Sequence, residues 1–165
     1  MPVNTGCDHR IELIGSEEKL RMGPIYQLSQ EEAKLLILYL NKIINEGKIR
    51  PSSSMVGSPI LFVRKSNSQS LQLCVHYRHL NDYMKNDKTP LPIMQELQSR
   101  LQGAVFIMKI DPKSSLHFIR MALGHERFAA VHTQCGRYEY VVMPFGLTNA
   151  PKHFKEKLIK YYNYC

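Results

Sequence analysis

The stretch RFAAVHTQCGRYEYVVMPFGLT, residues 127–148, contains two runs of strand-forming residues around a tight turn. Val, Tyr and Phe favour strands, and Cys135-Gly136 separates the runs 127–134 and 137–143. The pattern predicts a β-hairpin. After MPFGLT, Asn149 is a suitable cap for a helix over 150–162. A hairpin followed directly by a helix does not fit a regular alternation of parallel strands and crossover helices.

The sequence on either side of this stretch has the same mixed order. A second hairpin is predicted from PILFVR (59–64) and LQLCVHY (71–77), because apolar and polar residues alternate in the latter. AVFIMKID (104–111) and HFIRMAL (117–123) predict two more strands, whereas 78–92 is predicted to be polar loop. Hairpins and helices in this order favour an α+β fold.

Two further helices are predicted before residue 104. In 29–49, Ser29 and Glu32 have the spacing of a capping box, and Gly47 suits the helix end. A shorter helix is predicted over 92–103, opened by a proline. The first helix should bury one side, which carries the apolar residues Leu36, Leu40, Ile43 and Ile44.

The composition describes a basic, moderately apolar chain. Its 165 residues carry a formal net charge of +8, and 44% are hydrophobic, which argues against disorder and raises the probability of a polyanionic partner such as nucleic acid. No apolar run is long enough to span a bilayer, and the amino terminus lacks the apolar stretch of a signal peptide. The four cysteines are scattered, without a metal-binding pair. An intracellular location, cytoplasm or nucleus, is therefore expected.

A single carboxylate, Asp111, ends the predicted strand 104–111. Pro112 follows and cannot donate a ladder hydrogen bond, so the strand must end or become an edge there. Two interpretations are open: Asp111 caps the following turn, or it binds a hard cation such as Mg²⁺. One carboxylate alone is a poor magnesium site, and the sequence has no Walker loop, GxGxxG, HExxH or nucleophile elbow beside it.

Several ordered blocks of the chain resemble the reverse transcriptase of Gypsy/Ty3-type LTR retrotransposons. They are GKIRPSSSMVGSPILFVRK (47–65), LQLCVHYRHLN (71–81), TPLPIMQELQSRLQGAVFIMKIDPKSS (89–115) and YEYVVMPFGLTNAP (138–151). DHRIEL (8–13) followed by GPIYQLSQEE (23–32) is similar to the stretch that joins protease to reverse transcriptase in such polyproteins. The resemblance covers nearly the whole chain.

The resemblance implies a right-hand polymerase fold. Residues 29–165 would form the fingers and the first part of the palm, and residues 1–28 an extended lead-in. The family transfers nucleotides with two Mg²⁺ or Mn²⁺ ions held by three aspartates. Asp111 matches the first aspartate, and the backbone carbonyl at Pro112 matches a metal ligand. An RNA template, a DNA primer, a dNTP and the rest of a Pol polyprotein are the implied partners.

The resemblance also marks a nucleotide site. Lys65 matches a fingers lysine that meets the triphosphate, Gln72 stands where the family has an arginine, and Leu116 stands where an aromatic residue screens the ribose. Phe145 and Gly146 match the nucleotide-pocket pair. Two alternatives are open: Lys65 as an exposed hairpin lysine and Phe145 as an ordinary core aromatic.

Other positions depart from the family pattern. His76 replaces an aspartate and Phe118 a glutamine, whereas Tyr77-Arg78 and Leu80-Asn81 match, Tyr77 and Arg78 with an expected structural role. The sequence contains no Asp-Asp pair and ends within the helix that precedes the aromatic-x-Asp-Asp hairpin in the family. A catalytically incompetent polymerase fragment is therefore expected, with a nucleic-acid-binding module or an oligomerising structural fragment as alternatives.

Overall fold

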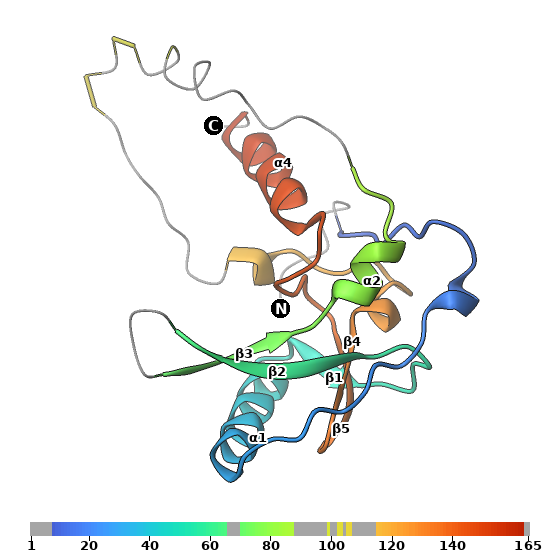
Figure 1. Cartoon of the computed structure of the whole chain (residues 1–165). Coiled ribbons are helices and arrows are strands. Elements are labelled where there is room, and N and C mark those ends of the chain that lie inside the picture. Colours follow the sequence, from blue (N-terminus) through green and yellow to red (C-terminus); the bar gives the residue numbers. More distant parts are fainter. Residues whose placement is uncertain are drawn as a thin grey trace.

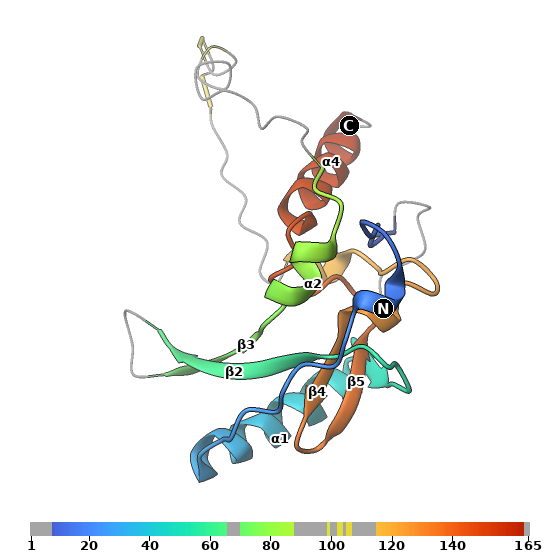
Figure 2. The ribbon, with the colours of Figure 1, turned by 45° about the vertical axis from the view of Figure 1, so that its right-hand side comes forward.

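The computed structural model describes residues 8–65, 70–87, 99, 102–103, 105–106 and 115–163. They form a mixed α and β arrangement around a five-stranded sheet of order β1-β5-β4-β2-β3. Helix α1 lies on one side of the sheet, whereas α2 and α4 lie on the other (Figures 1 and 2). The predicted α+β class is confirmed.

Both predicted hairpins are present. Strands β4 (Ala130–Thr133) and β5 (Gly136–Tyr140) pair antiparallel, as do β2 (Ser58–Arg64) and β3 (Leu71–Val75). A short strand β1 (Ile49–Pro51) pairs antiparallel with β5 at the edge of the sheet. The two hairpins join through two parallel residue pairs between β2 and β4.

Helix α1 (Gln30–Asn45) begins with the predicted capping box. The Ser29 side chain accepts from the Glu32 amide at 3.2 Å, and the Glu32 carboxylate accepts from the Ser29 amide at 2.8 Å. The helix ends before Gly47, whose φ of 67° suits a residue without a side chain. Leu36, Leu40 and Ile43 are buried as predicted, but Ile44 is 37% exposed.

Substituting Ser29 by alanine should lower the free energy of unfolding by about 1 kcal/mol, because the Glu32 amide loses its cap. Denaturant unfolding of the two proteins measures the difference. Ser29→Asp, which also caps helices, should restore most of the stability. Equal losses in the alanine and aspartate variants would contradict the assignment of the cap.

Two predicted elements differ from the structure. Residues 78–92 were predicted to be loop, but Arg78–Tyr83 form helix α2, with Leu80 buried beneath it. The predicted strand over 117–123 is wrong: the 3₁₀ helix η2 (Ser115–Phe118) occupies its start, and single bridges at Arg120 and Met121 follow. Tertiary contacts decide both: Leu80 is buried in the core, and among the described residues the stretch 117–123 pairs only through single bridges.

Helix α4 (Ala150–Asn163) is confirmed. The Asn149 carbonyl accepts from the His153 amide at 3.1 Å, which places Asn149 at the predicted cap position. The Asn149 side chain accepts from the Asp87 amide at 3.3 Å and donates to the Lys85 carbonyl at 3.0 Å. It therefore fixes the segment after α2 against the start of α4. The predicted strand 104–111 and helix 92–103 lie almost wholly outside the described residues.

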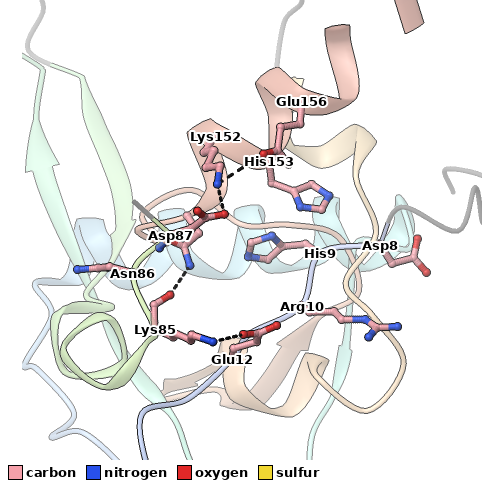
Figure 3. A pocket seen from close by; sticks show the side chains of 11 residues that line it. Asp8, His9, Arg10, Glu12, Lys85, Asn86, Asp87, Lys152, His153 and Glu156 are labelled. Atoms are coloured by element: carbon pink, nitrogen blue, oxygen red, sulfur yellow. Dashed lines mark hydrogen bonds and ion pairs between the residues drawn. The ribbon is translucent and has the colours of Figure 1, made fainter. Parts of the chain in front are cut away.

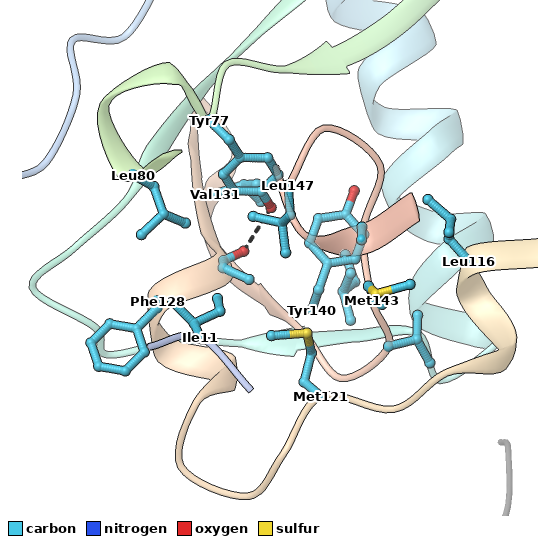
Figure 4. Packing of buried hydrophobic residues seen from close by; sticks show 14 of the residues in the cluster. Ile11, Tyr77, Leu80, Leu116, Met121, Phe128, Val131, Tyr140, Met143 and Leu147 are labelled. Carbon is cyan, nitrogen blue, oxygen red and sulfur yellow. Dashed lines mark hydrogen bonds between the residues drawn. The ribbon is translucent and has the colours of Figure 1, made fainter. Parts of the chain in front are cut away.

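The main core contains buried side chains from the sheet, from α1 and from α2. Buried side chains from all parts of the chain meet there (Figure 4), including Ile11, Tyr77, Leu80, Leu116, Met121, Phe128, Val131, Tyr140, Met143 and Leu147. Two short 3₁₀ helices, η1 (Glu17–Lys19) and η3 (Glu126–Ala129), lie in the connections. Among the described helices, none has the length and apolar character needed to span a membrane.

Candidate functional site

Four residues link the block 77–81 to the loop that follows β5. We call Tyr77, Asn81, Gly146 and Thr148 the clasp. Asn81 donates through Nδ2 to the Gly146 carbonyl at 2.9 Å, and its Oδ1 accepts from the Thr148 amide at 3.1 Å. The buried Tyr77 hydroxyl donates to the Ala129 carbonyl at 2.9 Å (Figure 4). One asparagine thus satisfies two backbone groups of the loop.

Gly146 lies at a position that favours glycine. Its φ is 99°, which residues with a Cβ rarely adopt. A Cβ there would also lie 3.4 Å from Tyr77 Cδ2 and 3.6 Å from the Val75 carbonyl oxygen. The loop backbone therefore passes directly over the Tyr77 ring, and its shape depends on the clasp.

Phe145 projects from this loop with 55% of its surface exposed. The interpretation of Phe145 as an ordinary core aromatic is therefore wrong. Its ring meets the His117 ring edge to face, with centroids 5.4 Å apart. Burial, and secondarily Lys48, lowers the pKa of His117, so the ring is neutral at physiological pH. An exposed aromatic held against a half-buried imidazole can offer its outer face to a flat ligand.

Lys65 and Gln72 share one face of the β2–β3 hairpin. In the register, Gln72 lies opposite Val63, and the Lys65 amide donates to the Ser70 carbonyl at 3.1 Å. Because side chains alternate along a strand, Lys65 and Gln72 point to the same side as Val63. All three are exposed. The hairpin therefore brings two of the predicted site residues together, although Gln72 contributes no charge.

The other predicted site residues are distributed differently. Leu116 is buried in the core at 8% exposure, and Phe118, two residues on, is 60% exposed. Asp111 and Pro112 lie outside the described residues. The described residues contain no group of three or more His, Cys, Asp or Glu side chains that could hold a metal ion. They do not form a complete metal site for the two ions implied by the resemblance.

The two histidines of the block 76–79 have separate partners. His76 Nδ1 lies 3.3 Å from the Tyr26 hydroxyl, with the two rings stacked, whereas the His79 ring meets the Tyr83 ring edge to face. Each of the two rings thus contacts a different tyrosine.

A cavity of about 610 Å³ lies apart from the clasp, between the amino-terminal segment and α4 (Figure 3). His9, His153 and the ion-paired Lys152 are among the residues that line it. This cluster could not be predicted from the sequence, because residues 1–28 have no hydrophobic periodicity that would indicate a buried histidine.

Comparison with known proteins identifies relatives of the chain. No protein-family profile matches it. The Transposon Tf2-3 and Tf2-7 polyproteins of Schizosaccharomyces pombe are each 34% identical to it over 152 residues, which is 91% of this chain. The chain spans only 11% of each polyprotein.

Solved structures share its fold at low sequence identity. Native prototype foamy virus protease-reverse transcriptase matches 93% of this chain with a TM-score of 0.75 and 14% identity. The foamy viral protease-reverse transcriptase in complex with an RNA/DNA hybrid matches 92% with a TM-score of 0.73 and 12% identity. In each case the chain covers 20% of the solved protein. The chain is thus homologous to a segment of the Ty3/Gypsy-type Tf2 retrotransposon polyproteins and has the fold of part of a reverse transcriptase.

Proposed function

We propose that these 165 residues are the fingers and the first part of the palm of an RNA-directed DNA polymerase, and that alone they do not catalyse nucleotide transfer. The observation that supports the polymerase assignment is the fold match over 93% of the chain to a protease-reverse transcriptase. The solved relatives in complexes hold an RNA/DNA hybrid or double-stranded DNA. We infer the same substrate class for the polyprotein that contains this segment.

In this proposal the described residues bind and position the nucleotide, and Asp111 contributes one metal ligand. Lys65 would meet a triphosphate from the exposed hairpin face, and the clasp would hold Phe145 and Gly146 against the base and sugar. Mg²⁺ or Mn²⁺ neutralises the transferred phosphate in such enzymes. With a single family aspartate among 165 residues, we expect weak metal binding, because one carboxylate supplies too few oxygen ligands.

A primer-extension assay tests the catalytic part of the proposal. The purified 165-residue protein, an annealed RNA template with a DNA primer, all four dNTPs and either Mg²⁺ or Mn²⁺ should give no extension above background. An active retroviral reverse transcriptase on the same template confirms the assay. Processive DNA synthesis by the 165-residue protein would overturn the proposal that it is incompetent alone.

A nucleic-acid-binding module without catalysis is the second candidate function. The formal net charge of +8 favours it, because cationic side chains displace counterions from phosphates. Retention of a fluorescent RNA/DNA hybrid should fall steeply with rising salt. Lys65→Ala should weaken binding, whereas Lys19→Ala should not, because η1 lies far from the outer end of the β2–β3 hairpin in both views (Figures 1 and 2). No retention at low salt would exclude this candidate.

A further inference from the structure

Residues 8–14, which we call the strap, join two segments far apart in the sequence. One segment is 120–122, which follows η2, and the other is 83–85, at the end of α2. Four backbone hydrogen bonds of 2.7–2.8 Å attach the strap: His9 N to Arg120 O, Ala122 N to His9 O, Ile14 N to Tyr83 O and Lys85 N to Glu12 O. The strap is therefore an integral part of the fold.

His9 is the most deeply placed polar side chain of the strap. Only 1% of it is exposed, and its ring meets the His153 ring of α4 edge to face, with centroids 5.1 Å apart. Among the described residues, neither ring nitrogen of His9 has a hydrogen-bond partner. Figure 3 shows the two imidazoles next to one another among the residues that line the cavity. The ring is thus packed as an apolar group.

The charged groups around His9 are not placed to stabilise a positive charge on its ring. From α4, Lys152 pairs with Glu156 and with Asp87 of the segment after α2. The remaining groups that face the cavity are His153, Lys85 paired with Glu12, and the strap residues Asp8 and Arg10, whose side chains point away from the His9 ring (Figure 3). No carboxylate among the described residues contacts His9.

His125 is the remaining titratable group near the strap. Its Nδ1 lies 3.2 Å from the Ile11 amide nitrogen and 3.1 Å from the Ile11 carbonyl oxygen. Depending on the tautomer, Nδ1 accepts a hydrogen bond from the amide or donates one to the carbonyl. Either tautomer therefore keeps one bond to the strap. The His9 ring, by contrast, has no hydrogen-bond partner for either nitrogen among the described residues.

Burial first, and then His153 and His125, lowers the pKa of His9 from the usual 6.5 to about 4. The docked strap disfavours the charged His9 ring. The free energy that stabilises the docked strap is therefore fully present above pH 6.5 and is lost progressively as the pH falls towards 4. Below that range the charged ring must leave its apolar site or remain there at a cost in free energy.

We propose that the strap is a proton-sensitive latch in which a neutral His9, packed against His153, holds residues 8–14 on segments 120–122 and 83–85, and protonation of His9 releases them. Release would separate these two segments and open the cavity beside α4. The latch does not depend on the proposed polymerase function. It is local, because α1 and the β2–β3 hairpin make no bond to the strap among the described residues.

Hydrogen exchange of the intact protein at pH 7 and pH 5 tests the latch. After correction for the intrinsic chemical rate, the opening equilibrium at the Ala122 and Ile14 amides should rise about 20-fold at pH 5, as a pKa of about 4 in the docked state requires. Interior amides of α1 should stay more protected than these two at both pH values, because the latch opens without unfolding α1. Unchanged protection at Ala122 and Ile14 would overturn the proposal, as would strap contacts that open no more readily than α1 at pH 5.

A matched variant isolates His9 from the other histidines. His9→Phe keeps an aromatic ring against His153 but cannot titrate, so its strap should stay protected at pH 5. A strap that still opens about 20-fold in this variant would assign the effect to another group. Should the variant fold poorly, an NMR titration of the His9 ring in the natural protein decides: a pKa at or above 6.5 would overturn the proposal.

Discussion

Replacing Tyr77 by alanine should lower the free energy of unfolding by about 3–5 kcal/mol, the range for deleting a large buried aromatic. The ring is 2% exposed and lies beneath the Gly146 backbone, and its hydroxyl satisfies the Ala129 carbonyl. The variant would leave a cavity and an unsatisfied acceptor together. Urea unfolding followed by circular dichroism measures the loss.

Two further variants separate the causes. Tyr77→Phe keeps the packing and leaves the Ala129 carbonyl unpaired, so it should cost about 1–2 kcal/mol. Leu38→Ala removes a side chain that is 67% exposed on α1 and should change stability by less than about 0.5 kcal/mol. A loss in Tyr77→Ala no larger than in Leu38→Ala would contradict the assigned role of the clasp.

Replacing Arg50 by methionine should lower the free energy of unfolding by about 2 kcal/mol. Breaking a fully buried ion pair costs roughly 3–5 kcal/mol, and the loss here should be smaller because half of the Arg50 side chain is exposed. Arg50 lies opposite Glu139 in the β1–β5 pair, with its Nε 2.6 Å from the Glu139 carboxylate. Its Nη2 lies 3.6 Å from the carboxylate of Glu126, which is 2% exposed. The hydrogen bond to Glu139 raises the pKa of the guanidinium. Its loss leaves two buried carboxylates without their cation, although Ser52 still donates to Glu139.

Arg127 provides the matched control. It forms an ion pair of 2.8 Å with Glu17, but both side chains are more than half exposed, so Arg127→Met should cost less than about 1 kcal/mol. Combining Arg50→Met with Glu139→Gln should recover part of the loss, because the second change removes an uncompensated charge. Equal effects of the two arginine substitutions in thermal unfolding would contradict the assigned importance of Arg50.

The elements that could be predicted from the sequence are those whose signals lie within their own residues. The two hairpins and α1 have alternation, a turn or a capping box within their own residues, and the structure confirms them. Helix α2 could not be predicted this way, because six residues show no period, and its stability comes from the burial of Leu80 and the two bonds of Asn81. Residues 117–123 look like a strand, but their partners are single bridges to distant segments.

The candidate site was predicted by resemblance to a family rather than by spacing. Its residues come from several segments, and only folding shows that Asn81 holds the loop of Phe145 and Gly146, or that Lys65 and Gln72 share a hairpin face. The metal-binding roles of Asp111 and Pro112 stay predictions. His9 could not be predicted, because nothing in its neighbours along the chain signals burial.

The strand order places β1 next to β5, although nearly ninety residues separate them in sequence. During synthesis, α1 and the β2–β3 hairpin can form from local contacts, but β1 has no partner until residue 140 has been made. Pairings so distant in sequence slow folding, because the intervening chain must first be ordered. Until then, the apolar faces of α1 and β2 remain uncovered and prone to association. A nascent chain stopped shortly before β5 should therefore bind chaperones more strongly than one that includes it.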